Sequence, residues 1–262
     1  MQFGWQDSSE ATRAQVEDFV RRCHSILGED LTAVYLHGSL AMNCFNPEIS
    51  DLDLLVISER SLTAADRERF AQEMLELSGS PHPVEMSVIA HDDLRQWQHP
   101  MPYEFHYSEG QRRLYQNALG EADFWQPQPD QADYDLAAHF VITRERGVTL
   151  VGESARVVLP EVPVDDYVDS ILGDFDDAAS SIQSAPVYGV LNLCRVYWFL
   201  QKNAIASKDE AGAWAVSTLP EEYRPVVFQA LREYRGGQGR YDANELQRFA
   251  DYIDAEVRAL LS

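Results

Sequence analysis

The amino-acid sequence predicts a protein in two parts, with a mixed α/β domain first and a bundle of helices after it. In the first part, short apolar runs at 34–36 and 54–57 alternate with stretches of amphipathic helical period, a pattern typical of a sheet covered by helices. Prolines and acidic residues interrupt this pattern at 152–165, and almost every later segment has a helical period. We therefore expect one domain over residues 1–157 and a helical domain over 158–262.

The first domain is expected to contain two helices and three strands before an irregular stretch. Ser8 or Ser9 can cap the first helix and Thr63 the second, because their side chains can accept hydrogen bonds from the first-turn amides. Four prolines interrupt the segment after the third strand, which predicts long loops there. In order, the expected elements are a helix over 8–27, strands at 34–36 and 54–57, a helix over 63–79, a strand over 83–89, loops over 92–130 and a helical or mixed segment over 134–150.

The second domain is expected to consist of helices only. Ser207 with Glu210 three residues later is a capping box that opens one of them, and Pro220 is expected to start the next. The expected helices cover 165–183, 187–203, 207–214, 220–234 and 243–261.

The pattern with the clearest chemistry is Gly38-Ser39 followed by Asp51-Leu52-Asp53, with an apolar run on each side. Asp51 and Asp53 are two residues apart, so in a strand their side chains share one face. Two carboxylates on one face repel each other unless a cation lies between them. A hard divalent ion with oxygen ligands, Mg²⁺ above all, meets that demand and brings nucleotide phosphates with it.

A third carboxylate, Glu85, lies in the alternating segment 83–89. If this strand lies beside the strand of Asp53, Glu85 joins the aspartates in one acidic site. The alternative is that all three are edge carboxylates on a solvated face. The preceding Gly-Ser pair and the phase of Glu85 favour the site.

The bulk composition restricts the partners. The net charge of −22 would repel a nucleic acid and attract a cationic small molecule. Three scattered cysteines indicate a reducing compartment without structural disulfides. Neither a signal peptide nor a membrane-spanning run is recognisable in the sequence. We expect a cytoplasmic monomer that binds neither nucleic acid nor membrane.

On the Gly38-Ser39, Asp51, Asp53 and Glu85 pattern, the chain resembles the polymerase-beta-type nucleotidyltransferases. More closely, it is similar to the aminoglycoside adenylyltransferases that inactivate streptomycin and spectinomycin, with a narrower signature at 192–197, 207–209 and 232–236. The resemblance implies an N-terminal nucleotidyltransferase domain, built from a mixed sheet with helices, and a C-terminal helical domain. It also implies Mg²⁺-dependent transfer of AMP from ATP to a drug hydroxyl, which confers antibiotic resistance.

The resemblance also assigns roles in the first domain. Asp51 and Asp53 would hold two Mg²⁺ ions, and Glu85 would ligate a metal or act as general base, two roles that need the same position. Gly38 would let the backbone approach the phosphates, and Ser39 and Ser50 could bind phosphate oxygens.

In the helical domain, Arg195 and Lys208 match phosphate-contacting cations of the family, and Tyr234 matches a residue near the adenine. Each has a structural alternative. Arg195 could form a salt bridge, Lys208 could be solvated, and Tyr234 could pack on the bundle.

The acceptor pocket departs from the family pattern. Members that accept streptomycin carry a Trp in the long loop, here replaced by Tyr107 or a neighbour, and an acid and a His that Pro186 and Gly189 replace. We therefore expect spectinomycin rather than streptomycin as acceptor. Glu104, Tyr107 and Glu109 are the candidate acceptor-binding residues, with solvated surface charge as the alternative for the two glutamates. Rival functions are the same chemistry on a lincosamide or an endogenous metabolite, and a nucleotide-binding regulator without turnover.

Overall fold

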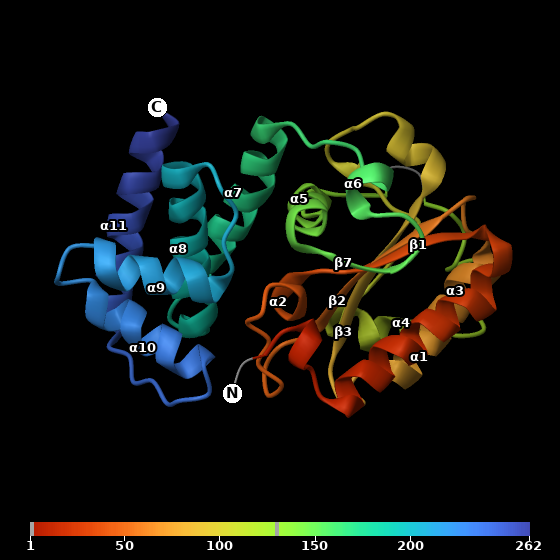
Figure 1. Cartoon of the computed structure of the whole chain (residues 1–262), viewed down its shortest axis with the longest axis horizontal. Helices are drawn as coiled ribbons and strands as arrows, with labels where there is room; N and C mark the ends of the chain where they lie inside the picture. The colour runs from red at the N-terminus through yellow and green to blue at the C-terminus, as the bar shows by residue number, and fades with distance from the viewer. Residues whose placement is uncertain (1–2, 129–130) are drawn as a thin grey trace. The chain divides into compact units, whose positions relative to one another are not determined.

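The computed structural model describes residues 3–128 and 131–262, which form two compact units. The first unit covers 3–167 and contains a β-sheet with helices, and the second covers 168–262 and is helical. The division between them falls after Tyr167, inside helix α7 (Val164–Ser181). The predicted fold class, a mixed sheet with helices followed by a helical region, is confirmed (Figure 1).

The first unit is built on a five-stranded sheet with the order β5-β3-β2-β1-β7. Strands β2 and β3 run parallel, and the remaining neighbours pair antiparallel, so the sheet is mixed. Parallel neighbours need a crossover, which helix α3 (Ala64–Leu77) supplies here. The strands are β1 (Leu31–Leu36), β2 (Leu52–Ser58), β3 (Val84–Ala90), β5 (Phe105–Tyr107) and β7 (Val148–Val151).

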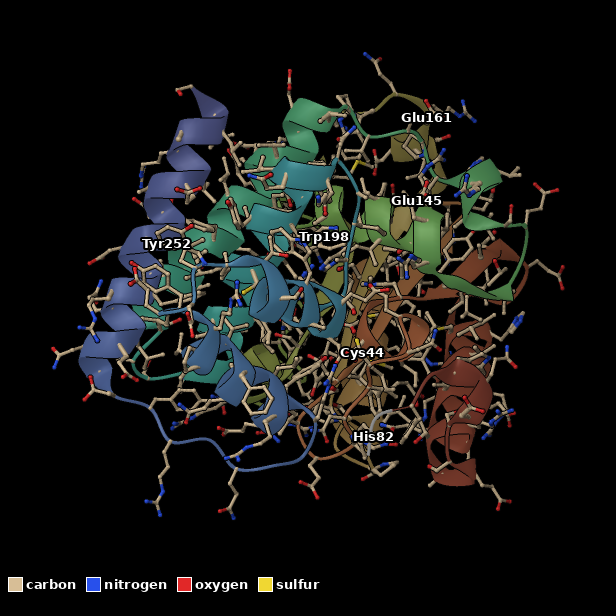
Figure 2. The ribbon with its side chains drawn as sticks, turned by 60° about the vertical axis from the view of Figure 1, so that its left-hand side comes forward. Cys44, His82, Glu145, Glu161, Trp198 and Tyr252 are labelled. Atoms are coloured by element: carbon tan, nitrogen blue, oxygen red, sulfur yellow. The ribbon has the colours of Figure 1, made fainter. Side chains whose placement is uncertain are left out.

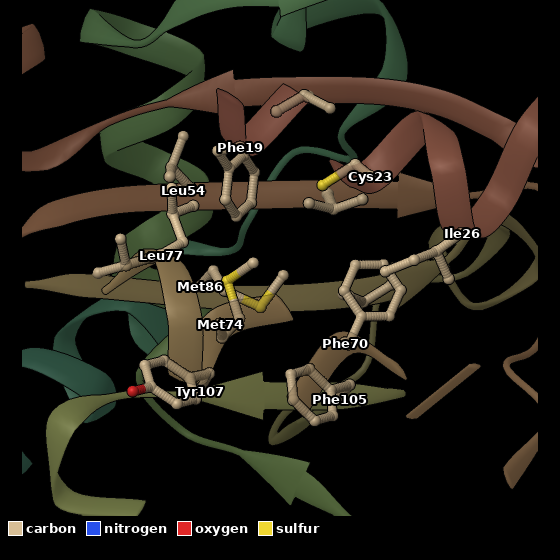
Figure 3. Packing of buried hydrophobic residues seen from close by; sticks show 14 of the residues in the cluster. Phe19, Cys23, Ile26, Leu54, Phe70, Met74, Leu77, Met86, Phe105 and Tyr107 are labelled. Carbon is tan, nitrogen blue, oxygen red and sulfur yellow. The ribbon is translucent and has the colours of Figure 1, made fainter. Parts of the chain in front are cut away.

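Helices α1 (Glu10–Leu27) and α3 cover one face of this sheet. Ser9 caps α1 by accepting a hydrogen bond from the Thr12 amide, and Thr63 opens α3 in a capping box with Asp66, so both predicted caps are confirmed. The apolar core on this face includes Phe19, Leu54, Met86 and Tyr107 (Figure 3).

The opposite face carries α5 (Leu136–Arg146) and α6 (Ala155–Val158) (Figure 1). Here Tyr35 and Leu55 pack with Leu136 and Phe140 in a second core. Side chains alternate between the two faces along each strand. Because Leu54 and Met86 face α1 and α3, the neighbouring Asp53 and Glu85 face α5.

The segment 92–130 was expected to be long loops, but it contains regular structure. Its aromatic residues explain the difference, because Phe105 and Tyr107 are buried in the core and extend the sheet as β5. The shorter elements of the unit are η1 (Trp5–Asp7), η2 (Gly28–Asp30), α2 (Gly38–Ala41), η3 (His91–Arg95), β4 (Met101–Pro102), η4 (Glu109–Gln111), α4 (Arg112–Ala118) and β6 (Ala132–Asp133).

The second unit contains the remaining helices, and they agree with the expected ones apart from their ends. The capping box of Ser207 and Glu210 is confirmed. The helix expected from Pro220 begins at Arg224 instead, because Pro225 takes the first-turn position where a missing amide costs nothing. After α7 come α8 (Pro186–Lys202), α9 (Lys208–Thr218), α10 (Arg224–Tyr234) and α11 (Ala243–Leu261).

Aromatic pairs join these helices. Trp198 on α8 packs edge-on against Trp214 on α9, and Tyr252 on α11 stacks on Tyr223, just before α10. Figure 2 labels Trp198 and Tyr252. Throughout the described residues, each helix is too short or too polar to serve as a membrane span.

Candidate active site

Three carboxylates meet at the start of the parallel strand pair. Asp53 and Glu85 are direct neighbours in the register of β2 and β3, and Asp51 precedes β2 by one residue. One ligand oxygen from each of the three lies within 4.8 Å of the others. The prediction that the strand of Glu85 lies beside that of Asp53 is therefore confirmed. An all-oxygen set of this kind fits a hard divalent cation such as Mg²⁺.

Gly38 lies directly against this cluster. It adopts a φ of +60°, and a Cβ atom placed there would lie 1.8 Å from Oδ2 of Asp53. The preceding His37 amide donates to the backbone oxygen of Asp53 at 2.9 Å, which holds the end of β1 beside β2. The Gly-Ser turn and the carboxylates therefore form one site, and only glycine fits at its centre.

The two candidate serines differ. The Oγ atom of Ser39 is buried and, among the described residues, has no hydrogen-bond partner. Buried hydroxyls are normally paired, so a phosphate oxygen beside the turn would satisfy this one. Ser50 instead accepts a hydrogen bond from the Asn46 amide at 3.1 Å, closing the turn before Asp51. Its predicted contact with phosphate stays a prediction.

The predicted nucleotide-binding residues of the helical unit have varied surroundings. Arg195 is partly buried and donates to Oδ1 of Asn192 at 3.2 Å, and it forms no ion pair within the described parts of the chain. The Lys208 ammonium lies 4.9 Å from the ring centroid of Tyr188, a cation–π contact. Tyr234 is only 5% exposed, which agrees with the packing alternative.

The three residues expected to bind the acceptor are not brought to the carboxylates. Glu104 forms a nearly buried ion pair with Arg67 and accepts from the Leu62 amide at 2.9 Å. Tyr107 pairs with Met86 across β3 and β5, so the alternation of the sheet turns its ring into the core on the face opposite Glu85.

Glu109 likewise has structural partners. It pairs with Arg112 at 2.7 Å and accepts a hydrogen bond from Ser78 at 2.5 Å. The Arg112 guanidinium, with Ser78, keeps the pKa of Glu109 below its usual value. Contacts within the protein therefore account for the positions of Glu104, Tyr107 and Glu109 without a ligand. Their role in binding the acceptor stays a prediction.

Several polar side chains on the carboxylate face had no role in the sequence-based prediction. The rings of His37 and His139 are 4.9 Å apart, and burial, followed by the nearby His139, lowers the pKa of His37 well below its usual value. A 2.9 Å hydrogen bond joins Ser87 Oγ to Nδ1 of His106. Strand alternation alone could have placed His37 and Ser87 on this face. Nothing in the sequence marked His139, which lies on α5.

Two family models match the chain. A nucleotidyltransferase domain model matches residues 16–105, which include the Gly38 turn and the three carboxylates. A model described as the C-terminal domain of aminoglycoside adenylyltransferase matches residues 157–256.

Similar proteins cover almost the whole chain. An aminoglycoside (3'') (9) adenylyltransferase of Klebsiella pneumoniae is 30% identical over 93% of this chain and 94% of its own length. A spectinomycin 9-adenylyltransferase of Campylobacter jejuni is 26% identical over 94% of this chain and 96% of its own. A crystal structure of a spectinomycin adenyltransferase from Enterococcus faecialis, with ATP and spectinomycin, superposes with a TM-score of 0.80 at 22% identity. It covers 94% of this chain and 99% of that one.

Proposed function

Because the chain belongs to the aminoglycoside adenylyltransferase family and is a nucleotidyltransferase, we propose that it transfers AMP from ATP to a hydroxyl of an aminoglycoside-type antibiotic. The observation that carries this proposal is the cluster of Asp51, Asp53 and Glu85, held within 4.8 Å against Gly38. A regulator without turnover would not need three carboxylates grouped in this way beside the Gly38 turn.

The reaction follows from these residues. The acceptor hydroxyl loses its proton to the Glu85 carboxylate, and its oxygen attacks the α-phosphorus of ATP. The bond from that phosphorus to the bridging oxygen breaks, and pyrophosphate leaves with the electron pair. Asp51 and Asp53 would hold two Mg²⁺ ions, with Glu85 as a third ligand in the alternative in which it is not the base. When bound, the ions would neutralise the phosphates and stabilise the charge of the transition state.

Other residues would bind the nucleotide. Gly38 lets the phosphates approach the backbone, and Ser39 offers its buried hydroxyl. Arg195, which has no acidic partner among the described residues, and Lys208 supply positive charge for the triphosphate. This assignment predicts that neutral substitutions at Arg195 raise the KM for ATP more than the KM for the acceptor.

Spectinomycin is the acceptor we propose. Relatives named for spectinomycin and for the (3'') (9) activity match nearly the full chain. At Pro186 and Gly189 the chain lacks the acid and the histidine expected for streptomycin. A net charge of −22 would attract the amines of such a drug.

The test is the exchange Asp53→Asn, which keeps the side-chain shape beside Gly38 but removes a charge. Transfer of labelled AMP to spectinomycin should fall about a thousandfold or more, because the metal supplies several kcal/mol of transition-state stabilisation. Glu59→Gln is the matched control, because Glu59 lies just beyond the other end of β2. Near-normal turnover in Asp53→Asn would contradict the proposal.

A panel of spectinomycin, streptomycin and a lincosamide, each incubated with labelled ATP, then identifies the acceptor by which compound gains AMP.

A further inference from the structure

The order of the strands gives the active site two distinct sides. Across the sheet, β1 with its Gly38 turn lies on one side of Asp53 and Glu85, and β5 lies on the other. In an in-line displacement, the attacking oxygen and the leaving group occupy opposite sides of the phosphorus. If the Gly38-Ser39 turn holds the leaving phosphates, the acceptor belongs on the side of β5.

The side of β5 carries a hydrogen-bonded pair on the face of the carboxylates. Ser87 lies two residues after Glu85, so it shares the same face of β3, and its direct neighbour on β5 is His106. The Ser87 hydroxyl and Nδ1 of His106 are 2.9 Å apart. This bond fixes the orientation of the ring and leaves Nε2 as the free edge, since no partner for Nε2 occurs within 3–128 and 131–262.

Helix α5 brings a second imidazole over this face. The ring of His139 lies 4.9 Å from that of His37, which follows β1 and is bonded through its amide to Asp53. His139 is also close enough to act electrostatically on His106. His139 makes no side-chain hydrogen bond to any described residue, and both His139 and His106 are partly exposed.

The chemistry of the His106 ring suits an acceptor better than a phosphate. Burial lowers the pKa of His106, which favours its neutral form, and the nearby Asp133 opposes the shift. A neutral imidazole offers one donor and one acceptor, which matches hydroxyl and carbonyl oxygens. A triphosphate calls instead for cations, the role proposed above for Arg195 and Lys208.

We propose that His106, on the β5 side of the carboxylates, and His139, which α5 holds near both His106 and His37, bind the acceptor by hydrogen bonds to the oxygens around the hydroxyl that receives AMP. This inference rests on the proposed function and names the residues that position its second substrate. The competing explanation is that the two rings only fill space between the sheet and α5.

Steady-state kinetics separates the two explanations. His106→Leu and His139→Leu should each raise the KM for spectinomycin about tenfold, the usual effect of losing one hydrogen bond, and leave the KM for ATP unchanged. His106→Gln and His139→Asn keep a polar edge and should recover part of the loss. His91→Leu is the matched control, since His91 is a partly exposed histidine that follows the far end of β3. Equal changes for both substrates, or no change, would overturn the assignment.

A binding experiment gives a readout that needs no turnover. Imidazole nitrogen NMR signals are recorded for the full-length protein with Mg²⁺ and α,β-methylene-ATP, which cannot release pyrophosphate, and again after adding spectinomycin. The signals of His106 and His139 should move with spectinomycin and stay in place with the nucleotide alone. If the signals move with the nucleotide alone, or do not move after either addition, the assignment is overturned.

The two proposals fail in distinguishable ways. Transfer of AMP to spectinomycin by the wild-type protein, with an unchanged acceptor KM in both leucine variants, overturns the histidine assignment alone. An absence of transfer to every drug in the panel overturns the proposed function, and the acceptor assignment with it.

Discussion

At Gly38 the backbone of the turn approaches the carboxylate of Asp53 more closely than a residue with a Cβ atom would allow. The Gly38 φ of +60° is costly for residues with a Cβ atom, and that atom would also collide with Oδ2 of Asp53. Backbone strain and collision are separate effects, so they can be separated by mutation.

Gly38→Ala should lose about 1–2 kcal/mol of stability from the left-handed backbone alone and nearly all AMP transfer from the displaced carboxylate. Gly28→Ala is the matched control, because Gly28 has a φ of +57° with open space around its Cβ position. Urea unfolding should show a loss of stability in both variants, because both positions have a positive φ, whereas only Gly38→Ala should lose turnover. Full activity in Gly38→Ala would show that Asp53 can move without consequence.

Ser39 and Ser50 make a second informative pair. Ser39→Ala removes a buried hydroxyl that lacks a partner among the described residues, so stability should stay equal or rise by about 1 kcal/mol. If that hydroxyl binds a phosphate, the KM for ATP should rise about tenfold. Ser50→Ala removes the acceptor for the Asn46 amide and should instead cost about 1 kcal/mol in thermal unfolding. An unchanged KM for ATP in Ser39→Ala would remove Ser39 from the site.

At the scale of elements, the crossover β2-α3-β3 places Asp53 beside Glu85. This could be predicted from sequence because a period of two assigns each side chain to a face, and the capping residue Thr63 marks the start of α3. The segment 92–130 was harder, because β5 is a strand of three residues whose place depends on burial of Phe105 and Tyr107. Short strands of this kind have too few residues to show a period.

Arg67 on α3 and Glu104, just before β5, form an ion pair that residue type alone does not reveal. Glu104 was expected to contact a cationic drug, yet it lies 12% exposed beside Arg67, itself 8% exposed. An acidic side chain in a loop does not reveal such a partner, because Arg67 is distant in sequence and is brought close only by folding.

Glu104→Leu should therefore destabilise the protein by about 3–5 kcal/mol, because it leaves the Arg67 guanidinium buried and unpaired. The double variant Arg67→Met/Glu104→Leu should recover much of that loss. Asp92→Asn, which breaks an exposed ion pair with Arg95, should change the unfolding free energy by less than about 1 kcal/mol. A raised acceptor KM in a stable Glu104→Leu protein would instead support the original acceptor role.

For the whole molecule, three histidines with lowered pKa values, His37 and His82 buried and His106 partly exposed, make stability depend on pH. Burial lowers the pKa of His37, His82 and His106, so below about pH 6.5 the unfolded chain binds protons that the folded chain does not. The contribution of these histidines to the free energy of unfolding is complete above that pH. It should fall as the pH falls toward their lowered pKa values in the folded protein.

Urea unfolding between about pH 7.5 and 5.5 should show this loss, before most carboxylates titrate. His82→Asn provides the comparison, since its ring is buried against Thr12 and Phe45. The variant should be less stable at neutral pH but lose less on acidification. A flat profile for the wild-type protein would mean that the buried rings do not titrate on unfolding.

The order of the chain gives the carboxylate cluster one more property. Asp51 and Asp53 leave the ribosome well before Glu85, and a nascent chain that ends within α3 lacks the third ligand. Affinity for divalent ions should consequently appear late in synthesis, when β3 has docked beside β2. If the cluster binds divalent ions, their binding would therefore report that β3 has docked beside β2.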